Sequence, residues 1–307
     1  MKLFRSGTIL ALCAMGLLAS VPRAGAQAGE KKAAAKVPIT TASEEARALY
    51  LKGRDLSEKL RATDSRKLFE QAAAKDASFA LAQVGLANTS GTAKEFFDAT
   101  SKAVALAGKV SEPERLMILG LDAGAKGEVA KQKEYYAKLV AAYPNDERAH
   151  NLLGGYHFGQ QDYAAAVAEY EKATAIDPAF SQPYNQLGYS YRFMGKYSEA
   201  ERAFKKYIEL IPGDPNPYDS YAELLMKMGR FDESIKNYQK ALSQDPNFVA
   251  SYVGIGNDQI FTGRGAEARA TFAKLAGVAR NDGEQRQAAF WTAISYVHEG
   301  ATDKALA

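Results

Sequence analysis

One spacing, 34 residues, recurs through the middle of the chain. Five windows of this length follow one another without insertion or deletion, and they begin at Pro113, Glu147, Ser181, Pro215 and Val249. The eighth residue of every window is small: Gly120, Gly154, Gly188, Ala222 and Gly256. Self-similarity at a fixed period of about 20 to 50 residues is typical of chains that stack one supersecondary unit on the next. The period therefore predicts a solenoid, in which each unit packs mainly on its neighbours.

Three further columns indicate what the unit is. The twentieth residue is small in all windows but the first, at Gln132, Ala166, Ala200, Ser234 and Ala268. The twenty-fourth is aromatic, at Tyr136, Tyr170, Phe204, Tyr238 and Phe272. The thirty-second is proline in four windows, at Pro144, Pro178, Pro212 and Pro246, and arginine at Arg280. Small residues let two antiparallel helices approach closely, and we expect the ring to fill the gap between one unit and the next. Proline ends the second helix because it cannot continue the hydrogen-bond ladder.

The spacing of apolar residues is helical from Thr41 onwards, and no strand-like alternation interrupts it. Glycine recurs at the fifteenth position, at Gly127, Gly195, Gly229 and Gly263. We expect it to end the first helix of each unit in the left-handed conformation. Capping boxes are predicted at Thr41 with Glu44 and at Ser111 with Glu114. Asp214 followed by Pro215 predicts another helix start.

These columns resemble the tetratricopeptide-repeat (TPR) family. That family has an aromatic at position four, Leu at seven, Gly at eight, Tyr at eleven, Ala at twenty, an aromatic at twenty-four, Ala at twenty-seven and Pro at thirty-two. The third window matches it with Tyr184, Leu187, Gly188, Tyr191, Ala200, Phe204 and Pro212, while Tyr207 replaces the second alanine. The resemblance implies an all-α fold, a right-handed superhelical solenoid of antiparallel helix pairs with about seven to eight repeats.

The resemblance divides the chain into segments of different quality. Residues 113–280 hold the five in-register units, and residues 41–112 hold degenerate copies that begin near Ala46 and Ala80. Residues 281–307 match a partial unit that begins near Arg286 and stops within its second helix, which we interpret as a truncated record.

The first 26 residues have the pattern of a secretory signal peptide. Lys2 and Arg5 precede an apolar run from Thr8 to Ala19, and Ala24-Gly25-Ala26 offers small residues at a cleavage site. An uncleaved N-terminal anchor is the alternative, although the run is short for a membrane span. Cleavage would leave Gln27 first, followed by a small, polar stretch at 27–40 that predicts a flexible linker. We therefore expect an exported protein, periplasmic or secreted, without a membrane span after cleavage.

The charge and cysteine content limit the kinds of partner and of chemistry that the chain can support. The chain has 39 Lys and Arg against 36 Asp and Glu, and Lys2, Arg5 and Arg23 lie in the first 26 residues, so residues 27–307 have 36 of each. A neutral chain has no long-range attraction to phosphate backbones, which argues against a nucleic-acid partner. The single cysteine, Cys13, also lies in the signal region, so the remaining chain has no thiol nucleophile or thiolate ligand.

The sequence contains no pattern for catalysis, for a cofactor or for a metal. His150 and His157 stand at positions four and eleven, where other units have tyrosine, so we interpret them as packing residues rather than metal ligands. His298 stands alone. Nucleophile elbows, phosphate loops and dinucleotide fingerprints are missing from the sequence. We therefore predict that the protein is not an enzyme.

The resemblance implies a binding surface on the concave face, formed by first-helix positions two, five, nine, twelve and thirteen. The candidate partner-binding residues at these positions are Arg148, Asn151, Asn185, Tyr189, Arg192, Asp219, Glu223, Lys227 and Asn257. Amides can pair with the backbone of a peptide, and aromatic and arginine side chains provide anchors. The leading hypothesis is a protein–protein interaction scaffold that binds a protein or peptide. An accessory subunit or binder of envelope glycan-processing machinery and a self-assembling structural protein are the alternatives, and the oligomeric state stays open.

Overall fold

The computed structural model describes residues 36–306, in which helices follow one another as antiparallel pairs. The signal peptide predicted at 1–26 lies outside the described residues. In chain order the pairs are α2 (Glu44–Glu58) with α3 (Ala62–Lys75), α4 (Ala80–Asn88) with α5 (Ala93–Leu106), α6 (Glu112–Ala125) with α7 (Val129–Ala142), α8 (Glu147–Gly159) with α9 (Tyr163–Ile176), α10 (Ser181–Phe193) with α11 (Tyr197–Leu210), α12 (Pro215–Lys227) with α13 (Phe231–Gln244), α14 (Val249–Phe261) with α15 (Gly265–Val278), and α16 (Asp282–His298) with α17 (Thr302–Leu306). A 3₁₀ turn, η1 (Ala107–Lys109), follows α5.

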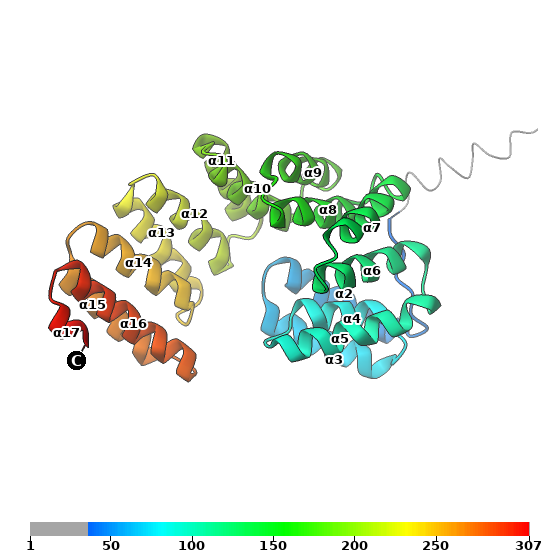
Figure 1. The fold of residues 1–307 in the computed structure, drawn as a ribbon, viewed down its shortest axis with the longest axis horizontal. Helices are drawn as coiled ribbons and strands as arrows, with labels where there is room; N and C mark the ends of the chain where they lie inside the picture. The colour runs from blue at the N-terminus through cyan, green and yellow to red at the C-terminus, as the bar shows by residue number, and fades with distance from the viewer. Residues whose placement is uncertain (1–35, 307) are drawn as a thin grey trace, which may run out of the picture.

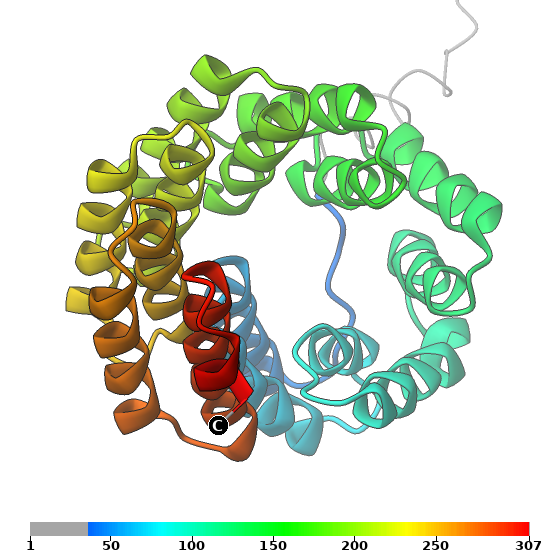
Figure 2. The ribbon, with the colours of Figure 1, turned by 60° about the vertical axis from the view of Figure 1, so that its left-hand side comes forward.

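The pairs stack into a right-handed superhelix, as predicted (Figure 1). In Figure 2 the helix pairs are arranged as a ring, whose interior is here called the channel, and the first pair comes near the later units. The turn at residues 60–64 and the loops at 213–216 and 244–250 line one cavity of about 640 Å³. Neighbouring first helices also contact one another, as α2 does with α4 and α12 with α14. The first helices therefore line the inner wall of the superhelix.

The columns of small and aromatic residues meet inside each unit. A Cβ atom added to Gly188 would lie 2.5 Å from the ring of Phe204, so the glycine makes room for the ring of its own unit. Phe204 and Ala200 are fully buried. The ring at position twenty-four also reaches the next unit, because Tyr238 lies directly against Gly254. Rings therefore pack within units and also wedge between them, and the second role is the one expected from the sequence.

The turn between the two helices of a unit has the backbone conformation expected from the glycine column. Gly195 has φ +72°. Gln161 and Leu60 take the same turn, with φ values of 60° and 61°, although they are not glycine. Because a side chain is strained in this region, these two turns store conformational energy that the glycine turns do not.

Two of the three predicted helix starts are confirmed. Ser111 and Glu114 form a capping box, and Asp214 caps α12 by accepting from the amide of Asn216. The capping box at Thr41 was wrong. The N-cap of α2 is Ser43, which accepts from the amide of Ala46 at 3.1 Å. The hydroxyl of Thr41 instead donates to Asp76 at 2.6 Å, because α3 ends beside it.

Residues 36–40 depart from the flexible linker expected at 27–40. They form an extended segment, here called the strap, that crosses the channel (blue in Figure 2). The strap is held because its amides meet carboxylates of α6 and of the turn before α8, and because Val37 and Ile39 pack on apolar side chains. The remaining linker residues, 27–35, lie outside the described part.

The last unit packs on α15 through Trp291, whose ring stacks on Phe272 at a centroid distance of 6.5 Å. Its first helix begins at Asp282, before the predicted Arg286, because Asn281 caps it. Within residues 36–306, no helix is long and apolar enough to cross a bilayer.

Candidate peptide-binding groove

The candidate residues fall into two parts of the inner wall. Arg148 and Asn151 line a cavity of about 580 Å³ in the first turn of the superhelix, here called the first-turn groove. It is bounded by side chains of α2, α3, α4, α6, α8 and α10 and by the strap. The other candidates lie further along, on α10, α12 and α14, and this part is called the second groove segment.

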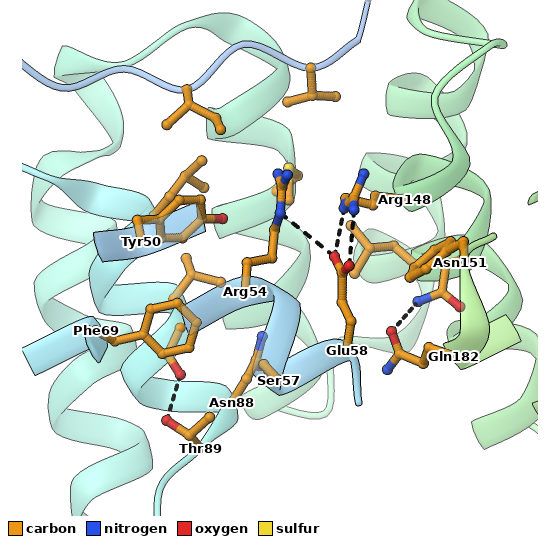
Figure 3. Close-up of a pocket in the computed structure, with 18 of the residues that line it drawn as sticks. Tyr50, Arg54, Ser57, Glu58, Phe69, Asn88, Thr89, Arg148, Asn151 and Gln182 are labelled. Carbon is orange, nitrogen blue, oxygen red and sulfur yellow. Dashed lines mark hydrogen bonds and ion pairs between the residues drawn. The ribbon is translucent and has the colours of Figure 1, made fainter. Parts of the chain in front are cut away.

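The first-turn groove has an apolar and a polar wall (Figure 3). Phe69, Leu81, Val84 and Met117 belong to the apolar side. On the polar side, Glu58 lies between two guanidinium groups. Arg148 holds it through two hydrogen bonds of 2.6 and 2.9 Å, and Arg54 lies 3.7 Å from the same carboxylate.

Arg148 joins two parts of the chain that are 90 residues apart. It also pairs with Glu147 and lies over the ring of Phe180 at 5.1 Å. Burial disfavours its charge, but the hydrogen bonds to Glu58 outweigh burial and raise the pKa of Arg148. Arg148 therefore fastens α8 to α2 across the turn of the superhelix, a role that its repeat position alone did not indicate.

Asn151 has one polar atom in use and one free. Its side-chain amide donates to Gln182 at 3.2 Å, whereas its buried Oδ1 has no hydrogen-bond partner. Burial raises the pKa of the nearby Tyr50 hydroxyl to about 12. The Oδ1 of Asn151 and the Tyr50 hydroxyl are therefore neutral polar groups enclosed in the wall of the first-turn groove.

In the second groove segment, side chains bridge successive first helices. Arg192 forms an ion pair of 2.8 Å with Glu223, and both residues stand 31 positions apart. Tyr189 donates to Ser220 at 3.2 Å with the same separation. The guanidinium of Arg192 also lies 4.8 Å from the centroid of the Tyr189 ring. The structure thus brings these predicted residues together, while using part of their binding capacity between units.

Asp219 is buried and accepts a hydrogen bond of 2.7 Å from Ser251 of the next unit. Burial raises its pKa to about 7, Ser251 lowers it, and the charge of Glu223 raises it. Asp219 consequently sits below the exposed surface of the groove.

Two candidates retain accessible polar groups. The Oδ1 of Asn185 has no hydrogen-bond partner, but it is buried and therefore does not face a ligand directly. Lys227 is exposed and Asn257 is half-buried, and neither side chain bonds to another residue of the described chain. Two exposed rings, Phe193 and Phe261, border this segment. These groups are the ones in the second groove segment most available to a ligand.

Sequence reasoning missed several residues of this wall. Glu58 lies in a degenerate unit, where repeat columns are weak, and its partner is distant in sequence. Asp258 is fully buried, and burial raises its pKa to about 6 although Ser234 lowers it. Its position ten is held in the other units by Asp122, Tyr156, Ser190 and Leu224, so the column does not single it out.

His150 occupies the aromatic slot that the sequence predicts. Its Nε2 lies 3.0 Å from the carbonyl oxygen of Pro144, and Nδ1 lies 2.6 Å from Glu169. In later units Tyr218 and Tyr252 donate to the matching proline carbonyls at 2.9 and 3.0 Å. His150 therefore makes the same bond as the tyrosines. Residues 36–306 contain no cluster of three or more His, Cys, Asp or Glu side chains suited to a metal.

The stacked helix pairs and their lined inner wall define an α-solenoid with a groove. Family models agree with this class: two described as tetratricopeptide repeat match residues 119–179 and 169–202, and one described as TPR repeat matches residues 222–257. Residues 119–202 and 222–257 therefore consist of tetratricopeptide repeats.

Comparison with curated proteins found no match. Among solved structures, the Cut9–Hcn1 hetero-tetramer of APC/C has a chain with a TM-score of 0.50 and 20% identity, covering 70% of this chain and 46% of that one. The MamA protein has a TM-score of 0.48 and 23% identity, covering 54% of this chain and 91% of that one. The first likeness concerns the fold alone.

Proposed function

We propose that the protein is a non-enzymatic scaffold that binds an extended segment of another protein in the second groove segment. The observation that carries this proposal is the set of unused polar groups on the inner wall. The exposed Lys227 and the half-buried Asn257 are not bonded to other described side chains. An extended peptide has one amide and one carbonyl per residue, which such groups can satisfy.

Rings at the rim of the groove supply anchoring area. Phe193 is 51% exposed and Phe261 is 59% exposed, so a partner side chain can cover both. Aromatic and arginine anchors dominate the binding energy of most protein interfaces. Arg192 is already placed by Glu223 and Tyr189, which reduces the entropy lost when it binds.

We further propose that the scaffold works outside the cytoplasm. The support is the basic start, the apolar run and the cleavage triplet in residues 1–26. Mass spectrometry of protein purified from its own cells should find Gln27 as the first residue. An intact Met1 or retention of residues 1–26 would contradict export by cleavage.

A pair of photo-crosslinkers tests the binding surface. With Cys13 changed to Ser, a cysteine-reactive crosslinker is attached at Lys227→Cys on the groove, or at the exposed Gln239→Cys on the second helix of the same unit. We expect a discrete crosslinked partner only from the groove position, and a several-fold weaker product when Tyr189→Ala is added. Equal products from both positions, or no product from the groove, would contradict the proposal.

A further inference from the structure

The strap lies in the first-turn groove in the manner of a bound peptide. Its backbone is extended, and it runs through the interior of the ring of helix pairs (Figure 2). Val37 and Ile39 line the cavity together with α2, α4, α6 and α8. The strap bonds to the repeat array through carboxylate side chains and the carbonyl oxygen of Asn145.

Two backbone N–H groups of the strap donate hydrogen bonds to the groove, and both acceptors are carboxylates. Val37 donates its N–H to Asp146 at 2.7 Å, and Thr40 donates its N–H to Glu114 at 2.7 Å. The hydroxyl of Thr40 also donates to Glu114. These hydrogen bonds require only an extended backbone and one hydroxyl side chain, so a peptide of another protein can form the same bonds.

Exposure alternates along the strap, since Val37 and Ile39 are half-buried while Lys36, Pro38 and Thr40 are exposed. Val37 packs beside Leu116 and Tyr143, and Ile39 packs in the cluster of Tyr50 and Phe79. Pro38, between them, is exposed. Lys36 pairs with Glu147 and donates to the carbonyl of Asn145 at 2.8 Å. The groove therefore selects a basic residue, then an apolar one, a variable one, another apolar one and a hydroxyl.

We propose that the first-turn groove is a second binding site, for an extended peptide of the pattern basic–apolar–any–apolar–hydroxyl, and that the strap occupies it as an intramolecular competitor. The inference extends the proposed scaffold function to a different part of the wall. A partner must displace the strap, whose effective concentration is on the order of millimolar because it is tethered. Binding is consequently weak until the strap is released.

Charge and space favour this partner class. Glu114, Asp146 and Glu147 face the strap, so the receiving wall is acidic and suits a basic residue. The adjoining cavity of about 580 Å³ leaves room beside Ile39. A partner with a larger apolar side chain at that place gains buried area that the strap does not use.

The test uses the full chain and a fluorescent peptide of residues 33–42, AAAKVPITTA. Val37→Asp with Ile39→Asp places acids against an acidic wall and should release the strap. Ala137→Asp with Ala141→Asp, both exposed on α7, adds the same charge away from the groove. We expect the strap variant to bind the peptide at least about tenfold more tightly than wild type, as removal of a tethered competitor requires. The α7 variant should bind as wild type does.

A peptide with Asp in place of both apolar residues serves as the matched control and should not bind. Equal affinity of the native peptide for wild type and the strap variant, or no binding to the strap variant, would overturn the proposal. These outcomes do not depend on crosslinking at Lys227, which reports only on the second groove segment.

A second measurement on wild type guards against misfolding of the strap variant. Excess native peptide should accelerate hydrogen exchange at the amides of Val37 and Thr40 several-fold, since it traps the strap outside the groove. Exchange in the core of α8 should stay unchanged. If the exchange rates at the amides of Val37 and Thr40 do not change at a saturating concentration of peptide, the proposal is equally overturned.

Discussion

Asp146 binds the amide of Val37 through Oδ2 at 2.7 Å while its Oδ1 accepts from the amides of Arg148 and Ala149, each at 2.9 Å. A single carboxylate thus caps the first helix of one unit and holds a segment 109 residues earlier in the chain. The cap orients the carboxylate toward the amide of Val37. Helix capping and attachment of the strap are therefore coupled at this residue.

Separating these two roles gives the first prediction. In Asp146→Asn the oxygen can keep the cap, but an NH₂ group then faces the amide of Val37. We expect faster hydrogen exchange at Val37 with a loss of stability below about 1 kcal/mol. Asp146→Ala also removes the cap and should cost about 1 to 2 kcal/mol of unfolding free energy. If Asp146→Asn and Asp146→Ala lower the unfolding free energy equally in chemical denaturation, the two roles of Asp146 are not separable.

The link between Arg148 and Glu58 gives the second prediction. Both side chains are largely covered, and the pair is bidentate, so it should couple more strongly than a surface pair. A double-mutant cycle with Arg148→Met and Glu58→Gln should give a coupling free energy of about 1 to 2 kcal/mol. Arg230→Met with Glu233→Gln, an exposed pair on α13 and the turn before it, provides the control and should give less. Similar coupling in both cycles would mean that the link adds nothing beyond a surface pair.

The strained turn at Gln161 gives the third prediction. Gln161→Gly should raise the unfolding free energy by up to about 1 kcal/mol, because glycine adopts φ 60° without a Cβ clash. Gly195→Ala, in the same turn of the next unit, should lower it by a similar amount. Thermal unfolding should show that Gln161→Gly is more stable and Gly195→Ala less stable than wild type. Destabilisation by Gln161→Gly would show that the glutamine side chain has a role not visible in its contacts.

The buried carboxylate of Asp219 gives the fourth prediction. Its pKa is about 7 when folded, above the ordinary value of 3.8, so the folded state holds the proton more tightly. Its contribution to stability is therefore fully present below about pH 4 and is lost as the pH rises toward 7. Asp219→Asn keeps an acceptor for Ser251 but does not titrate. The difference in unfolding free energy between Asp219→Asn and wild type should grow between pH 4 and pH 7, by about 1.4 kcal/mol per pH unit at most.

Asp76 should show the opposite pH dependence of stability in the same experiment, because its pKa is lowered rather than raised. Hydrogen bonds from Ser78 and Thr41 lower its pKa to about 2, so its contribution is lost as the pH falls from about 4 toward 2. Asp76→Asn should therefore differ from wild type mainly above pH 4. A constant difference between Asp219→Asn and wild type across pH 4 to 7 would contradict the raised pKa of Asp219.

The repeat columns predicted the fold because each records a local contact. The first helices α8, α10, α12 and α14 begin at the predicted Glu147, Ser181, Pro215 and Val249. Gly188, Ala200 and Phe204 lie together in the interior of their unit. Such contacts repeat with the period, so one sequence displays them several times.

The contacts that shape the groove were not predictable in this way. Arg148 meets Glu58, and Val37 meets Asp146, only because the superhelix turns back toward its own beginning. That closure depends on small angles between units, which no single column records. The small, polar composition of residues 27–40 predicts a linker, because it offers little to bury, yet Val37 and Ile39 within it are half-buried in the structure.

The central claim is that the inner wall, and not the outer helices, binds polypeptides. The crosslinker pair at Lys227→Cys and Gln239→Cys tests it most directly, since the two positions lie on the two helices of one unit. We predict that one partner is captured from the inner position and that its crosslinked product becomes several-fold weaker when Tyr189→Ala is introduced. Capture from Gln239→Cys alone, or capture that is indifferent to Tyr189→Ala, would contradict it.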